Sequence, residues 1–389
     1  MRRFLRLGEP ICRNDPLRVA PLMMDVDGQW KIEIEIQFPE YSFMRASTKE
    51  LLRAAYGQYA LGAFNVCNLE QIHGLFRGAS EARAPVIVQF TRVMRDYAHP
   101  LMLEQLLCGA ELIYPDVTFA VHHDHGDEAS CADAIESGHY SSVMIDASHR
   151  PFDQNVAATR RVVQMAHPRG IAVEAELGQL KGVEDEMSVA GKDALLTDAA
   201  QADQFVGCTG CDSLAVAIGT SHGAYKFSGS QRLHLDVLGE IQRRLAGFPL
   251  VLHGGSAVPA EEIERIRKAG GEIDSSASGV SEAELSRAIA LGVTKVNIAT
   301  DGRLIWTRVH REFFRDHPDE FDFMHPGRTY MKEFAEFVEK KCRSLGAAGK
   351  TSGHGGASPA ARTALSASLQ PAPDERADKA VRAPLESTR

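Results

Sequence analysis

The stretch "VTFAVHHDHGDE", Val117 to Glu128, joins a short apolar run directly to three histidines and an aspartate. A bounded apolar run rich in β-branched and aromatic residues is typical of a strand buried on both faces. The polar residues then fall at the carboxyl end of that strand. Because the chain has only 15 histidines, three within four residues indicate a functional strand end.

Seven further runs of this kind occur along the chain, and a segment with helical spacing follows each, as in "LEQIHGLFRGASEARA" after the first. Buried strands that alternate with helices predict parallel βαβ units. Eight such units over about 250 residues predict an α/β fold, the closed (β/α)8 TIM barrel, as a single catalytic domain. An open doubly wound sheet is the alternative, but its Gly-rich dinucleotide fingerprint is missing. The eight runs are 59–66, 84–90, 117–124, 141–147, 171–177, 213–219, 249–255 and 293–299.

Composition divides the chain into three parts. Residues 1–43 show no clear periodicity, and we expect a poorly ordered N-terminal extension there, with translation from Met44 left open as an alternative. Ser47 and Glu50 form the pattern of a capping box at the start of a helix. The barrel is expected over residues 44–345, and the Ala-, Ser-, Pro- and Gly-rich tail 346–389 is expected to be disordered.

Charge and cysteine content exclude several classes of protein. A formal net charge of −9 argues against a general binder of nucleic acids or membrane surfaces. No apolar run reaches the roughly 18 residues of a membrane helix, and Arg6, Glu9 and Arg13 interrupt any signal-peptide core. Seven scattered cysteines, an odd number, indicate reduced thiols. We therefore expect a cytoplasmic protein.

The residues able to carry chemistry cluster at the predicted strand ends, where the active site of a (β/α)8 barrel forms. Three strands end in a histidine, namely His125, His222 and His253. Neutral imidazoles suit zinc, and three protein ligands with one open position are typical of a catalytic zinc site. Other strand ends carry carboxylates and an amide: Asp124, Asp146, Glu174, Glu176 and Asn297.

A phosphate-binding loop is predicted after the seventh strand. The stretch "LHGGSA", Leu252 to Ala257, offers backbone amides of two glycines and a serine hydroxyl. Such a loop can form an anion-binding nest. Phosphate sites of barrels often follow the seventh and eighth strands, which fits this loop and "NIATDGR" after the eighth.

Together these residues resemble the class II, metal-dependent ketose-bisphosphate aldolases. The similar segments, in order between residues 47 and 345, include "GAFNVCNLEQ", "HHDHGDEASCADAI", "VEAELG", "DSLAVAIGTSHGAYKF", "LHGGSAVP" and "KVNIATD". The resemblance implies a catalytic zinc ion on His125, His222 and His253, with Asp146 and Glu176 holding a second or displaced metal. A second divalent site and a monovalent cation site are left open. Three histidines would also accept cobalt or iron.

The resemblance also implies roles for acid/base and substrate-binding residues. Asp124 would exchange a proton with the C4 oxygen of the ketose, Glu184 in a following loop would remove a proton from dihydroxyacetone phosphate, and Asn297 would assist catalysis. His123 stands where the family usually has an apolar residue, and as the alternating neighbour we expect it to point away from the cavity. Substrate and phosphate contacts are implied for Asn65, Thr91, Gly223, Gly254, Gly255, Ser256, Asn297, Thr300 and Arg303.

The implied reaction is zinc-dependent, reversible cleavage of fructose 1,6-bisphosphate to dihydroxyacetone phosphate and glyceraldehyde 3-phosphate, as in glycolysis and gluconeogenesis. The implied partners are the sugar bisphosphate, the triose phosphates and further copies of the chain, in a homodimer or larger. Ala299 stands where fructose enzymes often have aspartate and tagatose enzymes often alanine. A tagatose 1,6-bisphosphate or broader ketose-bisphosphate aldolase therefore stays open.

Two other functions compete with this interpretation. A Schiff-base aldolase needs a lysine inside the barrel, whereas we expect Lys226 past the sixth strand and Lys295 near the start of the eighth. A non-catalytic barrel used as a binding module would be expected to have lost a metal ligand or an acid/base residue. The three histidines, Asp124 and Glu184 are all retained.

Overall fold

The computed structural model describes residues 45–178, 196–220, 233–273 and 278–351, together with the backbone of a few short strands outside them. The chain divides into two units, Met1–Arg45 and Ala46–Arg389. In the first, β1 (Leu17–Val19) pairs antiparallel with β4 (Ile34–Ile36), and β2 (Met23–Met24) pairs antiparallel with β3 (Trp30–Lys31). The second unit holds the barrel. No helix of the described residues is long and apolar enough to span a membrane.

Eight parallel strands close into a barrel in the order β12-β14-β15-β5-β6-β7-β8-β9, and hydrogen bonds between β9 and β12 complete the ring. Each strand falls on one of the eight predicted runs, so the (β/α)8 prediction is confirmed and the open-sheet alternative is wrong. The strands are β5 (Leu61–Asn65), β6 (Val86–Thr91), β7 (Phe119–Gly126), β8 (Ser142–Ile145), β9 (Ala172–Leu177), β12 (Ser213–Val216), β14 (Leu250–Leu252) and β15 (Val293–Ile298).

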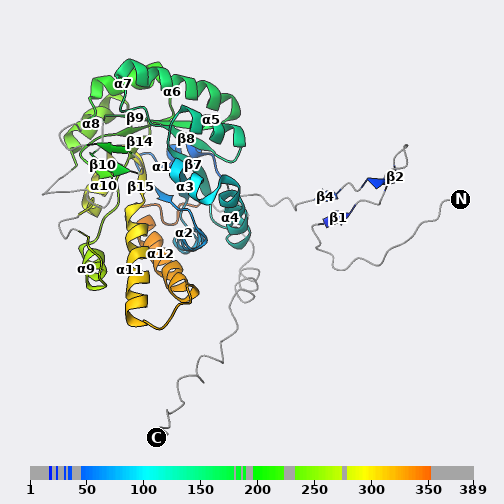
Figure 1. Ribbon diagram of the computed structural model, residues 1–389. Helices are drawn as coiled ribbons and strands as arrows, with labels where there is room; N and C mark the ends of the chain where they lie inside the picture. The colour runs from blue at the N-terminus through cyan, green and yellow to red at the C-terminus, as the bar shows by residue number, and fades with distance from the viewer. Residues whose placement is uncertain are drawn as a thin grey trace, which may run out of the picture. The chain divides into compact units, whose positions relative to one another are not determined.

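Helices surround the strands, as Figure 1 shows, and their apolar faces bury the outer side of the barrel. The helices are α1 (Thr48–Ala55), α2 (Leu69–Ala82), α3 (Arg92–Ala98), α4 (Pro100–Ile113), α5 (Glu128–Ser137), α6 (Phe152–Ala166), the 3-10 turn η1 (His167–Arg169), α7 (Ala199–Thr209), α8 (Leu235–Arg244), α9 (Ala260–Lys268), α10 (Glu282–Ala290), α11 (Thr300–Asp316) and α12 (Met324–Ser344). A small sheet joins β10 (Lys181–Glu184) to β11 (Met187–Val189) and β13 (Ser221–His222).

Helix α12 packs closely against α2, and a glycine makes the close approach possible. A Cβ atom on Gly78 would lie 2.4 Å from the backbone oxygen of Ala335 and 2.7 Å from Cβ of Val338. After α12 the chain continues along the end of α2. The amide of Gly349 donates to the oxygen of Ala82 at 3.0 Å, and the amide of Thr351 donates to that of Arg83 at 3.2 Å. The described part of the chain thus extends six residues beyond position 345.

The start of α1 differs from the predicted capping box. Ser47 is the N-cap residue and Glu50 lies in the first turn, but the Ser47 side chain makes no capping hydrogen bond among the described residues. The next hydroxyl makes tertiary contacts instead, because Thr48 Oγ1 lies 2.8 Å from the hydroxyls of both Ser141 and Ser142. The helix start is therefore held by the amino end of β8.

Asp212, just before β12, joins three elements at the amino ends of the strands. Its carboxylate accepts bonds from Lys49 Nζ at 2.5 Å, His167 Nε2 at 2.8 Å and the amide of Val173 at 2.9 Å. Burial alone would raise the pKa of Asp212, but these partners hold it below its ordinary value. This end of a (β/α)8 barrel serves stability rather than catalysis.

We expect Asp212→Asn to lower the free energy of unfolding by about 1–3 kcal/mol near neutral pH, because three donors lose a charged acceptor. The folded-state pKa lies below the unfolded value of about 3.9, so the stabilisation is fully present above that value and is lost as the pH falls from there through the folded-state pKa. Urea unfolding of both proteins between pH 7.5 and about 3 should show a constant difference down to about pH 4 and a shrinking difference below it. A gap that stays constant below pH 4 would contradict this assignment, and Glu50→Gln on the exposed face of α1 is the matched control.

Candidate active site

Asp124 lies fully buried inside the barrel near the carboxyl end of β7. Asn65 Nδ2 on β5 donates to one of its oxygens at 2.9 Å, and Asn297 Nδ2 on β15 donates to the other at 3.1 Å. Gln89 on β6 supports the first amide, since its Nε2 donates to Asn65 Oδ1 at 2.6 Å. Three neighbouring strands thus fix the orientation of one carboxylate.

His125 follows at an irregularity of β7, where the register with β8 shifts between His123 and Gly126. Its φ of 46° is uncommon for a residue with a side chain. Such strained positions persist where the surroundings hold them, and they cluster at functional sites. Here His125 Nδ1 lies 3.0 Å from Asp146 Oδ2 at the end of β8. The bulge brings an imidazole and a carboxylate from neighbouring strands together.

Two overlapping groups of potential metal donors meet at this end of the barrel. Donor atoms of Asp124, His125 and His253 lie within 4.8 Å of one another, as do those of His125, Asp146 and Glu176. His253, directly after β14, connects the two groups, because its Nδ1 lies 3.2 Å from Glu176 Oε2 and its ring centroid is 4.6 Å from that of His125. The barrel therefore gathers two imidazoles and three carboxylates.

The chemistry of these donors fits a divalent cation. Glu176 Oε2 is buried and makes no well-formed hydrogen bond among the described residues, although Nδ1 of His253 lies 3.2 Å away. Leaving a buried carboxylate oxygen without a partner is costly, and a bound cation would satisfy it. Imidazole and carboxylate ligands suit zinc and related first-row ions.

Protonation and metal binding compete at His253. Burial lowers the pKa of His253, but the carboxylates of Glu174 and Glu176 beside its ring outweigh that effect and raise the pKa to about 9. The nearby Asp146 has its pKa held below the ordinary value by His125 and Ser148, against the effect of burial. A metal ion binding to His253 would therefore have to displace a proton.

The loop after β14 is joined to the amino end of α11. Gly254 has a φ of 64°, and a Cβ atom on Gly255 would lie 2.2 Å from Val296 Cγ1, so both positions favour glycine. Asp301 accepts bonds from the amides of residues 257 and 258 at 2.9 and 2.8 Å. Ser256 Oγ is buried and has no partner among the described residues.

Polar groups suited to an anion thus lie together at the start of α11. The unpaired hydroxyl of Ser256 accompanies Thr300, the buried first residue of this 17-residue helix. Amides at the amino end of a helix favour a negative charge. Arg303 is exposed on the same first turn, and its charge lowers the pKa of Cys67 after β5, against the larger raising effect of burial. Thr91 ends β6 and accepts a bond from the amide of Met94 at 3.3 Å.

His123 points away from the donor groups, as the strand alternation predicts. Its Nδ1 lies 3.2 Å from the backbone oxygen of Phe90 and its Nε2 lies 3.1 Å from Ser130 Oγ on α5. The ring also contacts Tyr140 edge to face. His123 therefore packs between the barrel and its helices.

Three of the predicted site residues cannot be placed by their side chains. Glu184 is the last residue of β10, and His222 is the second residue of β13. The side chains of both lie outside the described residues, and so does Gly223, the third of these residues. Lys226, the lysine expected past the sixth strand, lies outside them as well. Their roles stay predictions.

Lys295 corrects one expectation. It is the third residue of β15 and lies fully buried inside the barrel, with Nζ 2.9 Å from one oxygen of Glu174 and 3.1 Å from the other. A lysine is therefore present in the barrel interior, although an ion pair holds it. Strand alternation could have found it, because residues two apart share a face and Asn297 faces the cavity. The same reasoning applies to Gln89, two residues before Thr91.

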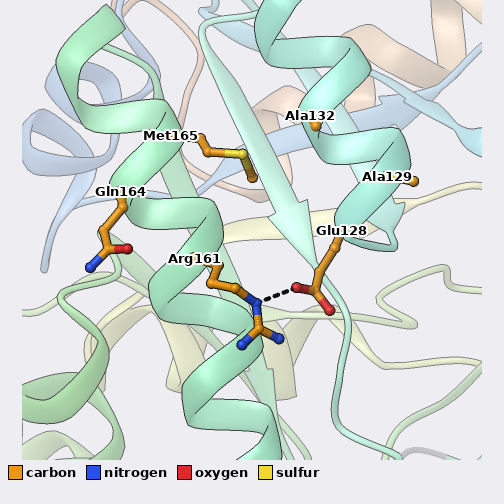
Figure 2. A pocket seen from close by; sticks show the side chains of 6 residues that line it. All are labelled: Glu128, Ala129, Ala132, Arg161, Gln164 and Met165. Carbon is orange, nitrogen blue, oxygen red and sulfur yellow. Dashed lines mark hydrogen bonds and ion pairs between the residues drawn. The ribbon is translucent and has the colours of Figure 1, made fainter.

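A surface pocket of about 490 Å³ lies away from these groups. Figure 2 shows that its lining comes from two helices of the outer layer, α5 and α6, with an ion pair between Arg161 and Glu128 at 2.6 Å. None of the buried donor residues lines it. The candidate active site is therefore the polar cluster at the carboxyl ends of the strands. The pocket residues are Glu128, Ala129, Ala132, Arg161, Gln164 and Met165.

A closed (β/α)8 barrel with buried histidine and carboxylate donors at its strand ends defines a barrel enzyme of the metal-dependent kind. The family model described as fructose-bisphosphate aldolase class-II matches residues 46–273 and 275–350. The chain therefore belongs to the class II fructose-bisphosphate aldolase family.

Curated relatives and solved structures agree with this membership. A protein from Giardia intestinalis named fructose-bisphosphate aldolase is 43% identical over 298 residues, which cover 75% of this chain and 90% of that protein. A Treponema pallidum protein of the same name is 40% identical over 327 residues, covering 78% and 97%. The crystal structure of the YdjI aldolase from Escherichia coli K12 matches with a TM-score of 0.62 and 29% identity, over 79% of this chain and all of that one.

Proposed function

We propose that this protein catalyses the reversible, zinc-dependent cleavage of fructose 1,6-bisphosphate to dihydroxyacetone phosphate and glyceraldehyde 3-phosphate. Family membership supports the reaction class, and the names of the relatives support the fructose sugar. The observation in this chain that carries the proposal is the fixed carboxylate of Asp124 beside the donor atoms of His125 and His253.

Asp124 is the base in the cleavage direction. Breaking the bond between C3 and C4 requires removal of the C4 hydroxyl proton. A carboxylate oxygen of Asp124 takes that proton while the amides of Asn65 and Asn297 hold the carboxylate in place. In the condensation direction the same group returns the proton to the C4 oxygen.

The metal ligands and the second acid/base group have the remaining roles in the reaction. When held by His125, His222 and His253, Zn²⁺ supplies Lewis-acid stabilisation of the negative charge that develops as the bond breaks. Asp146 and Glu176 hold a second or displaced ion. Glu184, from the segment after β9, protonates the three-carbon fragment and removes the same proton in reverse.

The two phosphates occupy separate places. The loop after β14 and the start of α11 bind the phosphate of the three-carbon half, because an unpaired buried hydroxyl and a helix amino end meet there. Arg303, exposed on the first turn of α11, binds the other phosphate, with Asn65 and Thr91 lining the substrate. The residues assigned to the three-carbon phosphate half are Gly223, Gly254, Gly255, Ser256, Asn297 and Thr300.

Release of triose phosphate from fructose 1,6-bisphosphate by purified, zinc-loaded protein, followed with coupling enzymes, tests this reaction. Failure to release any triose phosphate would reject this reaction and favour a barrel that binds without cleaving.

We also propose a cytoplasmic homodimer or larger assembly without a nucleic-acid or membrane partner. The molar mass of the purified protein, measured by light scattering, tests the proposed assembly. The mass of a monomer would reject it.

Ala299 gives a specific reason to keep tagatose 1,6-bisphosphate as a second candidate substrate. It follows β15 and is the N-cap residue of α11, one turn before Arg303. Alanine offers no group to hydrogen-bond a sugar hydroxyl, whereas aspartate at this position could do so.

We expect Ala299→Asp to raise the ratio of kcat/KM for the fructose sugar over the tagatose sugar by about 2- to 10-fold. This range corresponds to one hydrogen bond of about 0.5–1.5 kcal/mol made by one C4 configuration. Ala299→Leu is the control for added bulk. A ratio that is unchanged in Ala299→Asp, or that rises equally in both variants, would show that Ala299 does not determine the preference.

A further inference from the structure

A second layer of buried polar side chains lies next to the candidate metal donors, toward the amino ends of the strands. Glu174, His122 and Lys295 precede Glu176, Asp124 and Asn297 by two positions on the same strands, so they face the barrel interior as well. Their exposed fractions are 2%, 0% and 0%. Burying a lysine and a glutamate is costly unless they are paired and well bonded. Their presence in the barrel interior therefore suggests a function beyond packing.

Glu174 connects this layer to the donors above it. Its Oε1 lies 2.9 Å from Nε2 of His253, and Lys295 Nζ lies 2.9 and 3.1 Å from its two oxygens. Its Oε2 lies 3.7 Å from His122 Nε2. The carboxylate is therefore held between one ammonium group and the ring of a candidate metal ligand.

These contacts determine which nitrogen of His253 faces the metal donors. With Nε2 directed at Glu174, Nδ1 faces Glu176 Oε2 at 3.2 Å. A histidine that gives one ring N–H to a carboxylate has its tautomer and ring orientation fixed, which leaves the other nitrogen as the electron-pair donor. The contacts of Glu174 leave His253 only Nδ1 for a metal ion.

We propose that Glu174 and Lys295 form a positioning pair for His253, in which Glu174 accepts the Nε2–H and presents Nδ1 to the metal, while Lys295 holds the carboxylate in place and balances its charge. This inference rests on the proposed metal centre. It also explains why the interior lysine is not a Schiff-base nucleophile, because an ammonium group paired with a carboxylate has no free electron pair.

Two double variants distinguish positioning of the His253 ring by Glu174 from a role of the ion pair that depends only on its buried charges. E174Q/K295M and E174M/K295M both remove the ion pair, and glutamine and methionine are similar in size. Only glutamine keeps a carbonyl oxygen that can accept the N–H of His253, with its amide group free to face His122. The two proteins thus differ in the amide group that supplies this acceptor, at similar side-chain size and with the ion pair absent from both.

We expect Zn²⁺ affinity, measured by competition with a chromogenic chelator, to be about 10- to 100-fold weaker in E174M/K295M than in E174Q/K295M. The Co²⁺ absorption spectrum should also change only in the methionine variant, while the melting temperatures of the two metal-free proteins stay close. Equal affinities would overturn the positioning role.

A measurement on the unmodified protein does not depend on the folding of any variant. In zinc-loaded protein with nitrogen-15 histidine, the ring shifts of His253 should show a protonated Nε2 and a metal-bound Nδ1. A metal-bound Nε2 would overturn the proposal. Protein that binds Zn²⁺ but cleaves no sugar bisphosphate would reject the proposed reaction alone, and protein that binds no metal would reject the metal centre and the positioning pair together.

Discussion

Asp124→Asn should lower kcat for cleavage of fructose 1,6-bisphosphate by about 10²- to 10⁴-fold, the usual contribution of a positioned general base. Asparagine keeps the size of the side chain but cannot take the C4 hydroxyl proton. It also places an NH2 group against one of the two amides that now donate to Asp124, those of Asn65 and Asn297. A coupled assay at saturating substrate measures the effect.

Asp127→Asn is the matched control for this substitution. Asp127 caps α5 by accepting a bond from the amide of Ser130 at 2.8 Å, and asparagine is an equally good capping residue. We expect kcat within about twofold of the unmodified protein, since the change lies outside the donor groups. If Asp124→Asn retained more than a tenth of the activity, another group would have to be the base.

His253→Ala should remove bound zinc and lower cleavage by at least about 10³-fold. The substitution takes away a buried ring that both donor groups approach, and it leaves Glu176 Oε2 without the nitrogen that now lies 3.2 Å away. Charge stabilisation by a bound metal accounts for several kcal/mol of a barrier, and each 1.36 kcal/mol corresponds to a factor of ten in rate.

Zinc content by elemental analysis and the coupled assay check this prediction on the same samples, with His139→Ala as the control for loss of a half-exposed histidine. The melting temperature of chelator-treated protein distinguishes loss of metal from loss of fold. Full zinc content together with wild-type cleavage in His253→Ala would show that His253 is not a ligand.

The barrel could be predicted from the sequence because parallel strands are buried on both faces. Runs such as Val86–Thr91 and Leu250–Leu252 are therefore rich in apolar residues, and they stand out between helical segments. The polar residues at their carboxyl ends could be predicted for the same reason, since Asp124 and His253 interrupt or follow apolar runs where a barrel forms its site.

The features that the sequence did not reveal depend on tertiary contacts. The ion pair that holds Lys295 in the interior is made with Glu174, 121 residues away in the chain. The positive φ of His125 comes from a bulge between β7 and β8. Ser47 matches a capping pattern, but Thr48 makes the contacts that hold the helix start. The pattern of neighbouring residues in the sequence does not predict contacts between residues that lie far apart in the chain.

Cleavage of fructose and tagatose 1,6-bisphosphates by the purified protein, with and without EDTA, is the most direct test of the proposed metal-dependent reaction. We predict cleavage that favours the fructose sugar, is lost in EDTA and returns when Zn²⁺ is restored. Cleavage that is insensitive to EDTA, or no cleavage of either sugar by protein shown to contain zinc, would contradict it.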